Sequence, residues 1–258
     1  MRITALAENT SFTDSFACEH GLSLYIETGS HKILFDMGQI NLFAENAQKL
    51  GLDLSQVDIA VLSHGHYDHG GGLRRFLQLN SKAPVFVSRY AFEPHFNGTE
   101  KYIGLDTELK NSDRLIFTDD ECRIADRLTL LSCNKRKKLI DFGSANLNVF
   151  ENGVFCPEDF RHEQYLLIEE GGKRVLVSGC SHKGIVNIAE WFKPDVLLGG
   201  FHLMKLAPGE LLKENAQRLN TLDTDYYTFH CTGTEQYEYM KQFMQRLNRI
   251  RCGQTVCI

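Results

Sequence analysis

Three histidines and one aspartate fall within six residues, directly after an apolar segment. Residues 57–63 favour a buried strand, and His64, His66, Asp68 and His69 come where it ends. Imidazole and carboxylate groups hold zinc, iron or manganese in proteins. Glycines 70–72 then let the chain turn sharply into a short helix over residues 73–80. Without a metal ion, these four adjacent polar side chains would lack partners. The run therefore predicts a metal site on a rigid strand–loop–helix support.

Histidines also follow predicted strands later in the chain. His182, His202 and His230 come after the strands expected over 174–178, 195–200 and 225–229. We expect hairpins over 21–27/31–36 and 164–169/174–178, a buried strand over 84–88, and helices over 42–50, 185–192, 209–221 and 234–247. Strands that alternate with helices in two similar halves predict an α/β fold, one domain over 1–258 with helices on the outer faces of its sheets.

Composition narrows the class of protein. The chain has 258 residues, 43% of them hydrophobic, and a net charge of −5 that argues against a nucleic-acid surface. No apolar run approaches the roughly 20 residues that span a membrane. Eight cysteines without a C-x-x-C pair, and no export signal, predict reduced thiols and a cytoplasmic location. Weak periodicity and many polar groups over 89–125 mark a variable loop or lid, and we expect the lid region to extend over about 89–160. The basic residues 135–138 are expected to form a solvated turn.

The motifs resemble a known family. His64–His69, with Asp36 upstream in the run Leu34–Gly38, is similar to the H-x-H-x-D-H signature of the metallo-β-lactamase superfamily. More narrowly, four further segments resemble the branch of dihydropterin-ribofuranosylaminobenzene-phosphate synthases: Glu19–Ser23, Gly179–Asn187, Gly199–Leu203 and His230–Gly233. The resemblance implies a four-layer αβ/βα sandwich with a dinuclear metal site at one edge of its two sheets.

The resemblance also implies a ligand set. His64 and His66 would hold one divalent ion. His182, which lies in the narrower family's motif, is the better candidate to complete this site, although His162 is nearer the place where the superfamily has its third histidine. The second ion would be held by Asp68, His69 and His230, with Asp36 orienting ligands. Cys180 stands where the superfamily places a bridging aspartate, and it could be a metal ligand, a thiol behind the ligands or a small buried residue. Zinc is the first expectation for the metal, with iron and manganese as alternatives.

Three functions fit these residues. The first is hydrolysis of a phosphoester, lactone or amide by metal-bound hydroxide, with Asp68 fixing the water and His202 or His182 stabilising negative charge. The second is a transferase that condenses a dihydropterin pyrophosphate with a ribofuranosylaminobenzene phosphate. The third is a non-catalytic metal or ligand sensor.

The expected partner is a small, phosphorylated molecule, contacted by Glu19, His20, Lys183 and His202. His31, His95 and His162 are expected to be ordinary surface histidines. The sequence is compatible with a homo-oligomer. The amphipathic helices do not determine the oligomeric state, because each needs its one apolar face only for the core.

Overall fold

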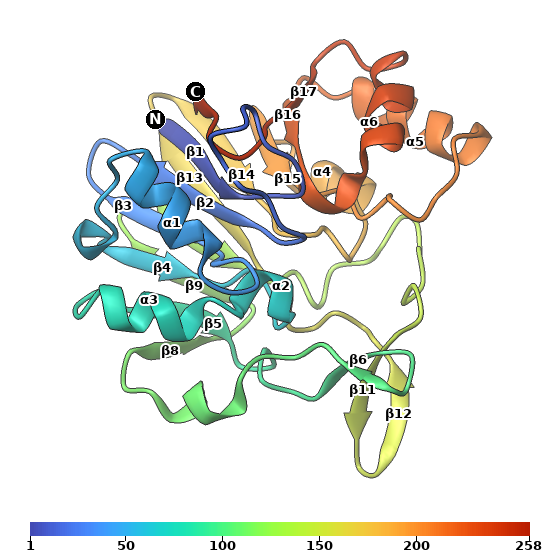
Figure 1. Cartoon of the computed structure of the whole chain (residues 1–258). Helices are drawn as coiled ribbons and strands as arrows, with labels where there is room; N and C mark the ends of the chain where they lie inside the picture. Colours follow the sequence, from blue (N-terminus) through green and yellow to red (C-terminus); the bar gives the residue numbers. More distant parts are fainter.

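Two seven-stranded sheets form the body of the protein, which a computed structural model describes over residues 1–258 (Figure 1). The first sheet, in spatial order, contains β18 (Thr255–Cys257), β1 (Arg2–Ala7), β2 (Ser23–Glu27), β3 (Lys32–Phe35), β4 (Ile59–Val61), β5 (Val85–Ser88) and β8 (Leu115–Thr118). The second contains β17 (Leu247–Arg249), β16 (Asp225–Thr228), β15 (Val196–Gly199), β14 (Lys173–Val177), β13 (Tyr165–Glu170), β10 (Leu128–Leu131) and β9 (Glu121–Ala125).

Helices cover the outer face of each sheet (Figure 1). The first sheet packs against α1 (Leu42–Lys49) and α3 (Leu73–Leu79), and the second against α4 (Ile185–Phe192), α5 (Glu210–Asn220) and α6 (Thr234–Lys241). A third apolar cluster lies between the two sheets and joins side chains from both. The layers therefore run helix, sheet, sheet, helix, which confirms the predicted four-layer sandwich.

Strand β4 illustrates why the sequence folds this way. Ile59 and Val61 point into the cluster between the sheets, whereas Ala60 points toward the helices on the outer face. A strand buried on both faces needs apolar residues throughout, which explains the continuous apolar segment. Because β3, β4 and β5 are parallel, as are β14, β15 and β16, the loops at their carboxyl ends meet at one edge of the sandwich.

A small four-stranded sheet lies outside the sandwich (Figure 1). It contains β12 (Val154–Pro157), β11 (Leu147–Glu151), β6 (His95–Asn97) and β7 (Lys101–Tyr102). We call it the lid sheet. The predicted lid region was too wide, because β8, β9 and β10 fall within 89–160 and belong to the main sheets.

Most other predicted elements are confirmed. Both hairpins form, as β2–β3 and β13–β14. The last helix, α6, is shorter than predicted and ends at Lys241, because Leu247 begins the edge strand β17. None of the helices combines the length and the apolar character that a membrane crossing requires.

Candidate metal centre

His64, His66 and His182 form the first group of candidate metal ligands. One nitrogen of each lies within 4.8 Å of the others, and all three side chains are buried. Nε2 of His64 and of His66, and both ring nitrogens of His182, have no hydrogen-bond partner. Burial, reinforced by the neighbouring imidazoles, lowers the pKa of each ring well below its usual value. Neutral buried imidazoles without partners are suited to hold a cation.

Asp68, His69 and His230 form the second group, across the interface between the two halves. The Nε2 atoms of His69 and His230 are 3.2 Å apart, and Oδ2 of Asp68 lies 3.8 Å and 3.4 Å from them. Burial alone would lower the pKa of His69, but the carboxylates of Asp36 and Asp68 raise it to about 9. The two carboxylates therefore favour positive charge at this place, and imidazole and carboxylate atoms are also the ligands that a divalent ion takes.

Asp36 fixes the direction in which the ligand rings point. Its Oδ2 lies 2.7 Å from Nδ1 of His69, which leaves Nε2 of that ring facing the centre. It also accepts hydrogen bonds from the backbone N–H and the hydroxyl of Ser63, both at 2.7 Å. The Ser63 hydroxyl in turn lies 2.8 Å from Nδ1 of His64. One buried carboxylate thus orients a ligand of each group, as the resemblance implied.

His230 is held by residues that the sequence did not indicate. Its backbone N–H donates to Oε2 of Glu8 at 3.0 Å, and its Nδ1 lies 2.8 Å from Oδ1 of Asn9. Both residues directly follow β1, a strand that the apolar pattern did not predict. The side-chain amide oxygen accepts the Nδ1 proton, so Nε2 of His230 faces the centre with its lone pair available.

Cys180 lies between the two groups. Its Sγ is 3.1 Å from Nε2 of His69, and it is close enough to share an ion with His64 or with His182 and His202. Burial and the neighbouring Cys231 raise the pKa of the Cys180 thiol well above its usual value. A metal ion would reverse that preference, because thiolate is the form that binds metals. Cys180 is therefore a candidate ligand for an ion held next to His64 and His69 or next to His182 and His202.

Two glycines bring the chain segments of the centre close together. A Cβ atom at Gly65 would overlap the carbonyl group of Ala91, and one at Gly179 would overlap the side chain of Ser63. The spacing of His64 and His66 therefore depends on glycine between them, and the approach of Cys180 to the first sheet depends on glycine before it.

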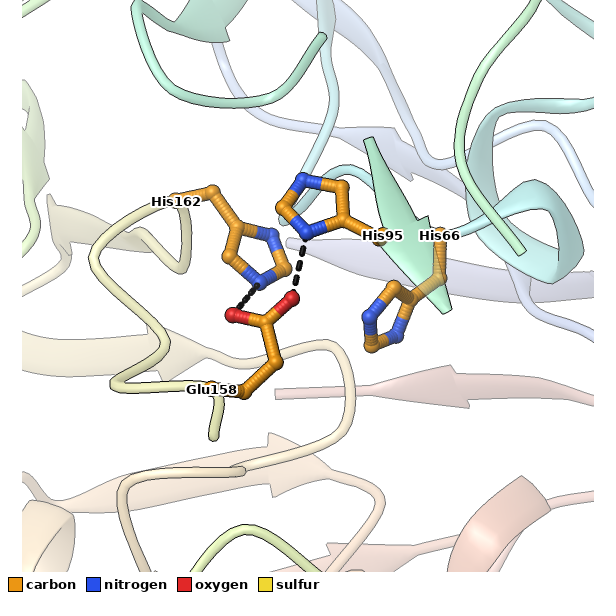
Figure 2. Close-up of side chains that lie close together, drawn as sticks. All are labelled: His66, His95, Glu158 and His162. Carbon is orange, nitrogen blue, oxygen red and sulfur yellow. Dashed lines mark hydrogen bonds and ion pairs between the residues drawn. The ribbon is translucent and has the colours of Figure 1, made fainter. Parts of the chain in front are cut away.

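His95 and His162 are fully buried, so the prediction that they are surface histidines was wrong. They surround Glu158 next to His66, as Figure 2 shows. Nδ1 of His95 contacts Oε1 of Glu158, and Nε2 of His162 lies 3.4 Å from Oε2. Burial would raise the pKa of the Glu158 carboxyl, but the two imidazoles lower it far below its usual range. Glu158 is therefore an anion at neutral pH.

Although these four side chains are close enough to share an ion, one hydrogen bond argues against His162 as a ligand. The backbone N–H of Gly65 donates to Nδ1 of His162 at 2.9 Å, and burial lowers the pKa of this ring to about 4. A neutral ring that accepts at Nδ1 carries its proton on Nε2, so it has no free lone pair for a metal. The group that includes Glu158 supports the ligand loop from behind.

The structure places the four expected substrate-binding residues in different surroundings. Lys183 is buried, and its Nζ donates to the carbonyls of Ser132 and Glu163 at 2.6 Å and 3.1 Å, so its predicted role as a substrate contact was wrong. Glu19 accepts a hydrogen bond of 2.9 Å from the backbone of Gln39 and supports a loop. His20 is half exposed, and its Nε2 lies 3.3 Å from Oδ2 of Asp68. His202 has a buried Nδ1 without a partner, beside His182.

A cavity of about 210 Å³ opens onto both groups of ligands. Its walls include Asp68, Cys180, His182, His202 and His230. Tyr67, Lys101 and Lys205 line it as well, and the sequence did not indicate them because lysines and tyrosines at isolated positions have no motif. Lys101 comes from the lid sheet, which therefore contributes directly to the cavity.

Comparisons with known proteins agree with this geometry. The chain is 29% identical, over 99% of its length and 96% of the relative's, to a Methanocaldococcus jannaschii protein named 7,8-dihydropterin-6-methyl-4-(beta-D-ribofuranosyl)-aminobenzene-5'-phosphate synthase. It is 30% identical to the uncharacterized protein MJ0448 of the same organism, over 90% of each chain. The solved structure of Tm1679, described as a metal-dependent hydrolase of the beta-lactamase superfamily, matches with a TM-score of 0.84 and 30% identity over 100% of this chain and 99% of that one.

A family model of the metallo-beta-lactamase superfamily matches residues 17–227. This range contains Asp36, the His64–His69 run, Cys180 and His182, whereas His230 lies just beyond it. With the four-layer fold and the ligand-bearing strand ends in place, the chain belongs to the metallo-β-lactamase superfamily.

Proposed function

We propose that this protein is a metal-dependent hydrolase of small phosphoesters. The observation that carries the proposal is the convergence of unpartnered histidine nitrogens from both halves of the chain beneath one open cavity. Lys101 and Lys205 favour a phosphoester over a lactone or an amide. Both are exposed at the cavity, and neither ammonium pairs with a carboxylate of the chain, although the net charge is −5. Unpaired cations on an acidic protein favour an anionic substrate.

The residues around the cavity would divide the work. Divalent ions held by the two groups would lower the pKa of water and polarise the phosphoryl oxygen. Asp68, at the centre, would accept a hydrogen bond from the attacking water and direct it. His202 would donate from its unpartnered nitrogen to the oxygen that gains negative charge. The water oxygen forms the new bond to phosphorus, the ester P–O bond breaks, and the leaving alkoxide takes up a proton. His182 belongs with the metal ligands in this scheme.

The test is turnover of bis-p-nitrophenyl phosphate by the metal-loaded protein. Asp68→Asn is expected to reduce turnover about 100-fold or more, because it removes both a ligand and the group that directs water. Asp119→Asn is the matched control, since Asp119 forms only an exposed ion pair with Arg89. Binding of the phosphodiester without turnover, or full turnover by Asp68→Asn, would overturn the proposal, and the first of these results would favour a sensor.

A transferase is the second candidate, and the relative named as a synthase supports it. In that reaction the metals would neutralise a leaving pyrophosphate, and the amine of the second substrate would replace water. The two candidates are separated by incubating the metal-loaded protein with a dihydropterin pyrophosphate, with and without a ribofuranosylaminobenzene phosphate. Pyrophosphate release that requires the second substrate favours the transferase, whereas release without it favours the hydrolase.

A further inference from the structure

A second cavity, of about 390 Å³, adjoins the metal cavity. The two share His182, His202 and Lys205 among their lining residues, so the cavities are adjacent and border the same side chains. We call the second cavity the annex. Its volume lies within the range of small-molecule sites, which is about 300–1,000 Å³.

The annex walls are mainly apolar and aromatic. Phe142 comes from the loop between β10 and β11, Leu211 from α5, and Phe160 from the segment after β12. The ring of Phe160 lies parallel to that of His182, with an interplanar angle of 6° and a centroid distance of 4.6 Å. Asp141 and Lys205 are the charged residues of the lining, and both are exposed. Such a surface binds uncharged planar groups.

Two features give the annex a defined place beside the metal centre. Gly184 has a φ of +92°, and a Cβ atom there would overlap the ring of Phe142, so this glycine lets Phe142 approach the His182 loop. His202 has a φ of +52°, a left-handed conformation that costs energy for a residue other than glycine. Its side chain lines both cavities, which places a group able to contact substrate at their junction.

We propose that the annex binds an aromatic ring that is joined by a short linker to the phosphate group placed at the metal centre. This inference rests on the proposed function and names its substrate class: small aryl-bearing phosphates rather than phosphates of sugars or simple alcohols. The linker is short because both cavities border the same side chains, His182 and His202, so that the ring and the phosphate lie close together. Leu211, which is 50% exposed, becomes covered when the ring is in place.

Calorimetry on the metal-loaded protein tests the inference without turnover. The ligands are methylphosphonate and naphthylmethylphosphonate, which share the anionic group and differ in the ring. We expect the naphthyl compound to bind roughly 10- to 100-fold more tightly, as burial of one ring predicts. Leu211→Ser and Phe142→Ala should each remove most of that advantage. Leu139→Ser should keep the advantage. Leu139 is about as exposed as Leu211 and lies on the same loop as Phe142, but it does not line the annex.

Equal affinity of the wild-type protein for the two phosphonates would overturn the inference, as would an advantage that survives in both annex variants. Thermal melting of each variant shows whether it is folded, and Leu211→Ser changes only a half-exposed side chain. The phosphodiester assay is independent of this result. Absence of turnover with a retained preference for the ring would overturn the hydrolase and not the annex, whereas turnover with equal phosphonate affinities would overturn the annex alone.

Discussion

The backbone N–H of Gly65 donates a 2.9 Å hydrogen bond to Nδ1 of His162, a residue 97 positions later in the chain. The peptide between the metal-facing His64 and His66 is therefore tied to the segment that follows the lid sheet. Glu158 faces the other nitrogen of His162 and keeps the proton there. This chain of contacts makes the geometry of the ligand loop depend on a carboxylate that does not face the metal.

Glu158→Gln is predicted to weaken zinc binding roughly 10- to 100-fold. An amide oxygen can accept from one of the two imidazoles, but its NH₂ group opposes the proton of the other. If His162 changes tautomer, its Nδ1 carries a proton and can no longer accept the hydrogen bond from the backbone N–H of Gly65. Competition with a chromophoric chelator measures the affinity. Glu93→Gln is the control, because Glu93 pairs with Arg161 and contacts no histidine through its carboxylate. An unchanged affinity in Glu158→Gln would refute the role of this network.

Asp36→Asn is predicted to lower metal affinity by a similar factor, through His69. The carboxylate accepts the Nδ1 proton of His69 and both N–H and O–H of Ser63, and an amide cannot accept all three without presenting its own protons. Asp58→Asn, at an exposed position in the same half, should leave affinity unchanged. The same chelator competition decides, and wild-type affinity in Asp36→Asn would contradict the assignment.

Cobalt substitution is predicted to reveal whether Cys180 is a ligand. If its sulfur binds, the Co²⁺ protein shows a near-ultraviolet thiolate charge-transfer band that Cys180→Ser abolishes, because a hydroxyl is a much weaker ligand than thiolate. Cys122→Ser, a partly buried cysteine in β9, should retain the band. A band of equal strength in Cys180→Ser, or no band in the wild-type protein, would leave Cys180 as a buried thiol without a metal contact.

Lys183→Met is predicted to destabilise the fold while sparing metal binding. The substitution leaves the carbonyls of Ser132 and Glu163 without their donor in a buried environment, at a cost of about 1–3 kcal/mol. Urea unfolding measures the loss. Lys173→Met, an exposed position on β14, should be close to neutral. A loss of phosphonate affinity without a loss of stability would restore Lys183 as a substrate contact.

Much of this site could be predicted from the sequence because its ligands follow strands with strong local patterns. The strands before His64 and His230 lie between two parallel neighbours, and the strand before His182 has one parallel neighbour, β15. Their apolar character is therefore nearly continuous and easy to recognise. Once the strands are placed, their carboxyl ends must meet at one edge.

The features that the sequence did not reveal depend on contacts between distant segments. His95 and His162 are buried only because the lid sheet and the segment after it fold over the ligand loop, and the four-residue spacing of Glu158 and His162 is a weak signal. The role of Lys183 was predicted wrongly because the two carbonyls that bind it lie far apart in the sequence. One belongs to Ser132, directly after β10, and the other to Glu163, just before β13, and no local pattern brings them together. Strand β1 was not predicted because it is only six residues long and mixes apolar with polar residues. The two residues that directly follow it, Glu8 and Asn9, hold His230 in place.

Elemental analysis of the freshly purified protein, beside His182→Ala and His230→Ala, is the most direct test of the central claim that two groups of ligands from both halves hold two ions. The account predicts about two metal ions per chain in the wild-type protein and about one in each variant, and the same measurement identifies zinc, iron or manganese. One ion or fewer in the wild-type protein, or two ions retained in both variants, would contradict it.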